Sequence, residues 1–342
     1  MNRIREVIKR KVKDYHLRRV YGERQVKCFV MITCLLIGLG LFVEFGYYST
    51  IGYLGREIAL EILKVHLLKL GMILSYAYVI DLIASFIVKT NPKTIKEAAL
   101  FPLKRPAFLF TNLLILMLSL DAPISVFCIA STVMTIFSQN TKNGHTFYRI
   151  HPILIGYLIG GFGIIITNQN LGLVELPPML SAPYMEVMNA IPSLTYDQFI
   201  TTFYSLPTVV FGIFEGNLCS TLIIPILVCG LFLMKRQVID YKTSLLYIGT
   251  YVLLGLLLGL IIKQPLWLII LFLLNGSVLL TGIFLITDVV TLERYKSFKY
   301  LYILAVALLT IILSYYVHFV FAPYLALGII QVLTLLIDFG HE

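Results

Sequence analysis

Positive charge is missing from the middle of this sequence. Residues 150–234 contain no Lys or Arg, although the whole chain has 27 of these residues and a net charge of +9. In a membrane protein, a loop without Lys or Arg is typical of the non-cytoplasmic side, because cationic loops are retained in the cytoplasm. The sequence therefore predicts that this central segment lies outside the cell and joins two halves of the chain.

Charged residues of either sign are scarce, at 13% of 342 residues, whereas hydrophobic residues make up 59%. This balance excludes a soluble globular protein. Several apolar runs reach about 18 residues, which is long enough for a helix to cross the ~30 Å hydrocarbon core of a bilayer. The alternating segments of about ten residues that build a membrane β-barrel are absent. The composition predicts an all-α, polytopic membrane protein.

Motifs of soluble enzymes are also missing. The five cysteines form no Cys-x-x-Cys pair and show no zinc-ligand spacing, so neither a disulfide framework nor a metal site is indicated. The chain contains no phosphate-binding loop, no metalloprotease helix and no Ser-His-Asp order of note. We therefore expect no catalytic residues of a soluble-enzyme type.

The N-terminus holds much of the positive charge, with ten Lys or Arg in residues 1–27. A nucleic-acid-binding arm is the less favoured interpretation. A cytoplasmic topology signal that also touches anionic membrane lipid is favoured, and we expect no nucleic-acid partner. The loops at 89–106, 139–151 and 287–299 carry Lys or Arg as well, and they are expected on the same side.

About ten membrane spans satisfy every charged loop and place both termini in the cytoplasm. A break is expected before Pro123, because proline disfavours helix at the residue before it. The charged segment 57–69 is expected to lie on the membrane surface as a separate amphipathic turn. The expected spans are 26–47, 67–88, 107–120, 123–138, 152–167, 217–234, 243–262, 266–286, 300–318 and 321–338.

Five spans precede the central segment and five follow it. Because five is an odd number, two such repeats would be inverted relative to each other, as in many transporter folds. The stretches LFTNLLILMLSLD (109–121) and LLTGIFLITD (279–288) each have Thr near the start and Asp at the end. We therefore expect two inverted five-helix repeats. The expected units are a basic segment 1–25, a first half 26–168, an extracytoplasmic connecting loop 169–216 and a second half 217–342.

Three clusters of polar residues could bind a ligand. The first could stack on a flat ring, or be an ordinary interfacial loop. The second, at the start of the sixth span, could bind an anionic or carbonyl group through free backbone amides, or simply cap a helix. The third could hold a ligand group or a helix terminus. The clusters are Gly144, His145, Phe147 and His151; Gly216, Asn217, Ser220 and Thr221; and Thr287 and Asp288.

Polar residues within the apolar runs form a further set of candidates. An acidic residue inside a membrane is by default a functional hypothesis. The alternative is that such a residue lies near the end of its span and reaches the interface. The set comprises Asp81, Thr111, Asn112 and Asp121, with Glu44 as another acid near a span end.

Three stretches, in order, resemble the membrane-subunit family shared by the Rnf D subunit and the Nqr B subunit. Residues 143–157 are similar to the family's Gly-(Tyr/His)-Asn-x-Phe-Asn-Pro-x-x-x-Gly-Tyr. Residues 216–242 resemble its small-residue helix start, an apolar span with a late glycine (Gly230), and a basic residue before Val-Ile. Residues 287–291 resemble its Thr-Asp-Pro-Val-Thr.

The resemblance implies a membrane subunit of a flavin-dependent, ion-coupled electron transport complex in a bacterial cytoplasmic membrane, with other membrane subunits as partners. In that family, FMN is attached to a Thr in a Gly-Ala-Thr context. This chain has no such motif, and the central Thr195, Thr201, Thr202 and Thr208 lack its context. The family's Asn and Pro are replaced by His151 and Val289. We therefore expect a divergent member without covalent FMN, and leave non-covalent FMN or riboflavin open.

Two alternatives remain on the same fold. One is a transmembrane solute or ion transporter that has lost electron transfer, and the other is a structural subunit without a cofactor. Whether the purified protein is yellow separates the redox subunit from both. The redox subunit is expected to act as part of an oxidoreductase or translocase complex rather than as a stand-alone enzyme.

Overall fold

The structure is a computed structural model, and it describes eleven stretches of the chain. The described residues contain ten apolar helical segments, four of which are long and apolar enough to cross a membrane. These helices confirm the predicted all-α polytopic membrane protein. The described stretches are 24–46, 49, 55–87, 106–118, 120–138, 141–142, 145–146, 150–171, 217–263, 275–316 and 321–339.

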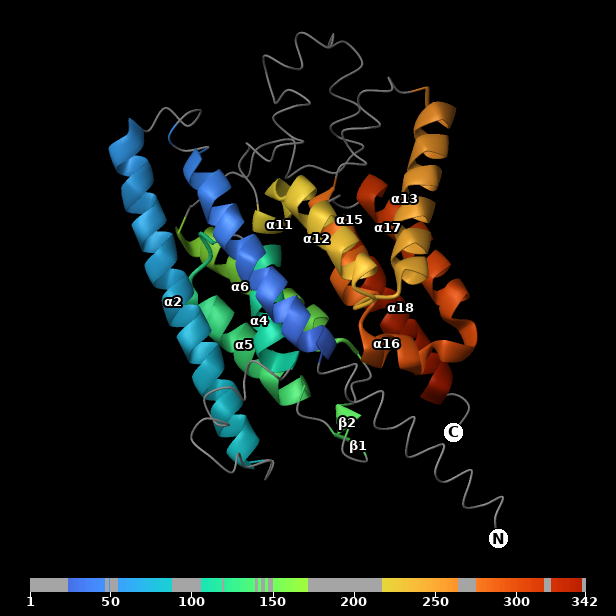
Figure 1. Cartoon of the computed structure of the whole chain (residues 1–342), viewed down its shortest axis with the longest axis horizontal. Helices are drawn as coiled ribbons and strands as arrows, with labels where there is room; N and C mark the ends of the chain where they lie inside the picture. The colour runs from blue at the N-terminus through green and yellow to red at the C-terminus, as the bar shows by residue number, and fades with distance from the viewer. Residues whose placement is uncertain are drawn as a thin grey trace.

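The first half contains five of the helical segments (Figure 1). Its only described strands are β1 (Thr141–Lys142) and β2 (His145–Thr146), which pair antiparallel. The helices are Arg24–Gly46, α2 (Gly55–Ile87), α4 (Pro106–Met117), α5 (Ile124–Ser138) and α6 (Pro152–Leu171).

The second half contains the other five. Two of them are composite: α11 (Leu218–Thr221) leads into α12 (Ile223–Lys235), and α15 (Gly276–Leu280) continues as the π-helix η2 (Thr281–Leu285). The single helices are α13 (Tyr241–Ile261), α17 (Lys299–Tyr316) and α18 (Ala322–Phe339), and the short α16 (Val289–Arg294) and η3 (Lys296–Phe298) precede α17.

The expected break before Pro123 is present. Helix α4 ends at Met117, and α5 begins at Ile124, directly after the proline. The backbone amide of Val126 donates to the Pro123 carbonyl at 3.1 Å, which starts the new helix. Proline at the first position of α4, Pro106, costs no hydrogen bond, because the first amides of a helix have no partner within it.

The expectation of a separate surface turn at 57–69 is wrong. Helix α2 runs without interruption from Gly55 to Ile87. Its charges are compatible with one long helix because they lie on different faces. Glu61 and Lys64 are exposed and pair at 2.7 Å, whereas His66 is buried.

The two halves have the same internal arrangement. Helix α5 packs on α6 as α17 packs on α18, α2 packs on α5 as α13 packs on α17, and α4 packs on α6 as α15 packs on α18. Corresponding helices run in opposite directions. In Figure 1 the helix Arg24–Gly46 rises while α12 descends, and α2 descends while α13 rises. The described helices therefore form an inverted repeat.

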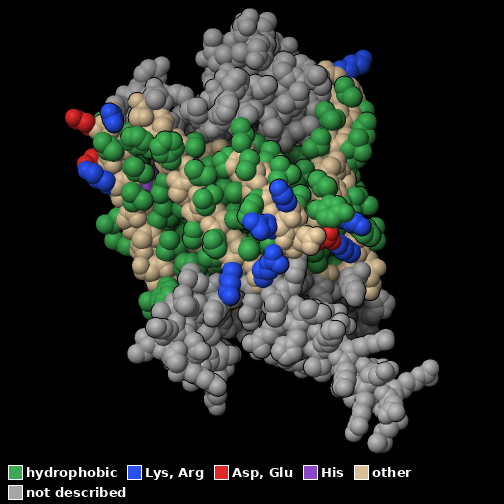
Figure 2. Space-filling view, in the orientation of Figure 1, with side chains coloured by type: hydrophobic (Ala, Val, Ile, Leu, Met, Phe, Trp, Pro, Cys, Tyr) green, Lys and Arg blue, Asp and Glu red, His purple; other side chains and the backbone are tan. Residues whose placement is uncertain are grey.

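The surface has the pattern of a membrane protein. Figure 2 shows a broad band of hydrophobic side chains across this face, with many of the Lys and Arg side chains toward its lower edge. Exposed apolar residues occur along the outer helices, such as Phe42 at 72%, Leu68 at 63% and Leu231 at 63%. Such exposure is unfavourable in water and favourable against lipid.

Candidate functional site: polar contacts where the two halves meet

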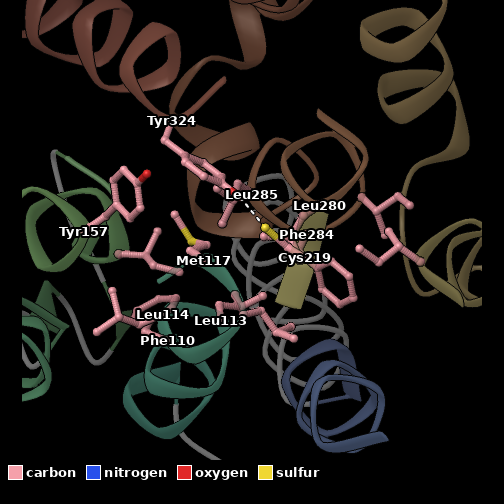
Figure 3. Packing of buried hydrophobic residues seen from close by; sticks show 14 of the residues in the cluster. Phe110, Leu113, Leu114, Met117, Tyr157, Cys219, Leu280, Phe284, Leu285 and Tyr324 are labelled. Atoms are coloured by element: carbon pink, nitrogen blue, oxygen red, sulfur yellow. Dashed lines mark hydrogen bonds between the residues drawn. The ribbon is translucent and has the colours of Figure 1, made fainter. Parts of the chain in front are cut away.

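Short helices from both halves meet at the centre of the molecule. Helix α11 contacts both α4 and α15. Figure 3 shows Leu113, Leu114 and Met117 of α4 and Leu280, Phe284 and Leu285 of the α15–η2 segment around Cys219. These side chains are almost completely buried. The junction is therefore a packed apolar core in which each polar group stands out.

Cys219 is the polar centre of this core. Its sulfur lies 3.3 Å from the hydroxyl of Tyr324 and 3.5 Å from the Ser277 hydroxyl. The Tyr324 ring meets the Tyr157 ring edge-on, with 4.8 Å between centroids. The Tyr157 hydroxyl is buried and has no hydrogen-bond partner among the described residues. The sequence analysis did not select Cys219 as a candidate.

Asn217 links the two halves. Its side-chain amide donates to the carbonyl of Met117, the last residue of α4, at 2.7 Å. It makes no side-chain cap on its own helix. The last carbonyls of a helix have no partner within it, so this bond satisfies a group that would otherwise be orphaned. The Asn217 side chain therefore joins two helices and does not cap its own helix.

Gln25 makes the equivalent bond for the other half. It is buried, and its side-chain amide donates to the carbonyls of Thr287 at 3.1 Å and Val238 at 3.3 Å. Thr287 follows η2, the end of the third span of the second half. Met117 and Thr287 both lie six positions after the matching threonines, Thr111 and Thr281, of the two similar stretches. Sequence reasoning missed Gln25, which stands at the start of its half as Asn217 does.

His151 is a packed side chain. Its backbone amide donates to the Gln331 side chain at 2.8 Å, and its ring meets Phe110 edge-on at 4.9 Å. Its Nδ1 accepts from the Ile153 amide at 3.4 Å. Burial lowers the pKa of His151 to about 4, against the opposing effect of the Asp288 carboxylate. The ring is therefore neutral at pH 7.

The other members of the first two clusters are only partly described. Thr221 donates from its hydroxyl to the Leu218 carbonyl at 3.0 Å, within its own helix. His145 lies in β2 and Ser220 in α11, but their side chains lie outside the described structure. Gly144, Phe147 and Gly216 lie outside the described residues altogether.

The third cluster, Thr287 and Asp288, makes local hydrogen bonds in the segment that follows η2. The Asp288 carboxylate accepts from the backbone amide of Thr291 at 2.9 Å and from its hydroxyl at 3.0 Å. This arrangement caps the N-terminus of α16, as short polar side chains commonly do. Thr287 donates from its hydroxyl to the Ile283 carbonyl. Both residues are thus engaged in local structure.

Three of the intramembrane candidates lie within helices: Thr111 and Asn112 in α4, and Asp81 in α2. Asn112, fully buried in α4, donates to the Thr33 hydroxyl at 3.3 Å and the Cys34 sulfur at 3.4 Å, while its Oδ1 has no partner among the described residues. Thr111 donates to the Ala107 carbonyl and to Ser131, both at 3.4 Å. Asp81 is fully buried in α2.

Asp121 and Glu44 meet at one residue that the sequence analysis did not select. The two carboxylates lie on either side of His66 in α2, at 3.5 and 3.3 Å from its ring nitrogens. The structure therefore brings together two of the candidate acids with a buried imidazole.

The described polar groups of the candidate clusters form hydrogen bonds within this chain. His151, Asn217, Thr221, Thr287 and Asp288 each use a polar group on a neighbouring part of the protein. No described group of three or more His, Cys, Asp or Glu residues could hold a metal ion.

The fold defines a polytopic helical membrane protein in which inverted helical halves are joined by short broken helices. The chain matches the model of the NQR2, RnfD, RnfE family over residues 13–341, and it belongs to that family. Membership supports a membrane subunit of an Rnf/Nqr-type complex. No curated protein matches the chain.

Proposed function

We propose that this protein is a membrane subunit of a flavin-dependent, ion-coupled electron transport complex of the Rnf/Nqr type. The observation that carries the proposal is the family match over nearly the whole chain, residues 13–341. The inverted arrangement of the helices supports it, because inverted repeats are common among proteins that move ions across membranes. Other membrane subunits of the same complex are the proposed partners.

We further propose that flavin, either FMN or riboflavin, is held non-covalently or by partner subunits. The chain has no Gly-Ala-Thr sequence. The described side chains of the candidate clusters are already engaged within the protein. This subunit then contributes a membrane scaffold to the complex, and the flavin supplies the redox chemistry where it is bound.

The visible absorption spectrum of the purified protein tests this proposal. The protein is purified in mild detergent, alone and with its co-purifying subunits, and the spectrum is recorded before and after acid precipitation. We expect flavin absorption that leaves with the supernatant, in the complex at least. Flavin that stays with the precipitated chain would show covalent attachment and overturn the non-covalent assignment. A colourless complex would overturn flavin dependence.

A cofactor-free subunit or a transporter on the same fold is the second candidate. It is favoured by the hydrogen bonds of Asn217 and His151, which occupy residues that the resemblance had associated with ligand binding. A colourless protein that drives solute or ion uptake into lipid vesicles would support transport. A colourless protein without uptake, but required for assembly of the complex, would support a structural role.

We propose that the chain lies in a bacterial cytoplasmic membrane with both termini in the cytoplasm. Lys235 ends α12, Arg236 follows it, and the Arg24 side chain donates to the Arg236 carbonyl, so these cations lie at one end of the bundle. Cationic ends are retained in the cytoplasm. Reporter domains fused after residue 342 and within residues 172–216 are expected to be active on opposite sides of the membrane.

A further inference from the structure

Three ionisable side chains from three segments converge at the end of the bundle where the helix Arg24–Gly46 ends. Glu44 lies in the last turn of that helix, His66 in α2, and Asp121 in the turn between α4 and α5. His66 Nδ1 is 3.3 Å from Glu44 Oε1, and His66 Nε2 is 3.5 Å from Asp121 Oδ1. The side chain of His66 is 7% exposed, against 20% for Glu44 and 50% for Asp121.

This geometry requires more than a neutral imidazole. A neutral ring has one N–H donor and one lone pair, whereas both nitrogens of His66 face a carboxylate oxygen. One of the two contacts would then place a lone pair against an anionic oxygen. With a proton on each nitrogen, both contacts become charge-assisted hydrogen bonds. Imidazole is a stronger base than a carboxylate, with an ordinary pKa of ~6.5 against ~4, so the extra proton belongs on the ring.

The surroundings favour a bound positive charge. Glu44 Oε2 is buried and has no hydrogen-bond partner among the described residues. A buried carboxylate is costly unless it is paired, and His66 is the partner that the structure supplies. Lys69, almost one turn further along α2, is a second cation at this end of the bundle; it interacts with Asp121 and donates to the Leu120 carbonyl, so the two carboxylates face two cationic groups. The Glu61–Lys64 pair on the same helix is exposed and self-contained, at 2.7 Å.

We propose that Glu44, His66 and Asp121 form a proton-binding site. The bound proton joins the helix Arg24–Gly46, α2 and the α4–α5 turn, and its loss turns one contact repulsive and weakens the attachment of the turn to α2, where the bond from Lys69 to Leu120 remains. The ligand is a proton rather than a metal ion, because no described group of His, Cys, Asp or Glu is arranged to hold a metal. The site does not depend on whether the complex binds flavin.

Nitrogen-15 NMR of the histidine rings tests the proposal directly. The full-length protein, which has six histidines, is labelled at these rings in lipid nanodiscs, and His66→Gln assigns the His66 signals by difference. At a pH of about 7.5, above the ordinary histidine value of ~6.5, we expect both ring nitrogens of His66 to carry a proton. In the double variant Glu44→Gln, Asp121→Asn we expect one nitrogen to lose its proton.

Glu61→Gln is the matched control, because it removes a carboxylate from the same helix without touching His66. It should leave the His66 signals unchanged. A wild-type His66 with one bare nitrogen at this pH would overturn the site, as would a double variant that keeps both protons. Should His66→Gln fail to fold, the Asp121→Asn variant, at a half-exposed position, assigns the signals by their shift instead.

Discussion

Asn217 and Gln25 make equivalent hydrogen bonds at opposite ends of the molecule. Each precedes or begins the first helix of its half, and each donates from its side-chain amide to a carbonyl at the end of the other half's third span, Met117 for Asn217 and Thr287 for Gln25. The distances are 2.7 and 3.1 Å. The inverted repeat is therefore preserved in individual hydrogen bonds, and these bonds hold the halves together.

Replacing Asn217 should weaken the junction. Asn217→Ala leaves the Met117 carbonyl without its donor, and an unsatisfied buried polar group costs about 1–3 kcal/mol. Asn217→Asp has nearly the same shape but, when ionised, only accepts hydrogen bonds, so we expect it to cost more than the alanine. Thermal unfolding in detergent measures both. If both variants are as stable as wild type, the bond does not hold the halves together.

His151 should make the protein sensitive to mild acid. Burial places its folded-state pKa at about 4, below the ordinary 6.5, so the unfolded chain binds the proton more readily. Stability is unaffected above pH ~6.5 and falls as the pH drops toward about 4, by up to about 3 kcal/mol.

The variant His151→Asn tests this expectation. It keeps the backbone bond to Gln331 and removes the titrating ring. Unfolding midpoints measured across this pH range should fall for wild type and remain nearly flat for the variant. Parallel curves for the two proteins would show that His151 is not the acid-sensitive group.

Gly230 lets α12 approach η2. A Cβ at Gly230 would lie 2.4 Å from the terminal carbon of Ile283, so alanine must push that side chain aside. Overpacking of this kind costs about 1–3 kcal/mol. Gly249→Ala in α13 is the control, because a Cβ there meets nothing within 4 Å, and we expect it to be neutral or slightly stabilising. Equal stability of the two variants would contradict close packing at Gly230.

Asp240 fixes the start of α13. Its carboxylate accepts from the Lys242 amide at 3.2 Å and the Thr243 hydroxyl at 2.8 Å, and it pairs with Lys299 of α17. Burial raises the pKa of Asp240, but the bonds from Lys299 and Thr243 outweigh it, and the pKa is lowered.

The contribution of the helix cap can be separated from that of the ion pair with Lys299 by substitution. Asp240→Ala removes the cap and should cost about 0.5–2 kcal/mol. Asp240→Asn keeps a capping oxygen and loses only the charge, so it should cost less. Chemical denaturation of the two variants at neutral pH makes the comparison. Equal losses for the two variants would show that the ion pair, which both variants lack, dominates over the cap.

The sequence identified candidate residues by their chemical type, but it did not predict which contacts each of them makes. Asp121 and Glu44 could be selected from sequence because acids are rare in apolar runs. Their partner His66 could not, since it lay in a charged stretch that suggested a surface turn. His151 and Asn217 were selected for ligand binding from their residue type and their position beside a turn or a helix start, and their motifs also resemble the family's. The structure shows them bonded to Gln331 and Met117, which lie 180 and 100 residues away.

The sequence alone determined that this is a polytopic helical membrane protein, that a helix ends before Pro123 and, through its motifs, which family the chain belongs to. Hydrophobicity along the chain and Pro123 decide the first two features, because each acts locally on the backbone and on its transfer into lipid. Only the tertiary structure decided that Gln25 and Asn217 join the halves and that Glu44, His66 and Asp121 meet. Those contacts depend on how helices distant in sequence pack, and no local pattern encodes that packing.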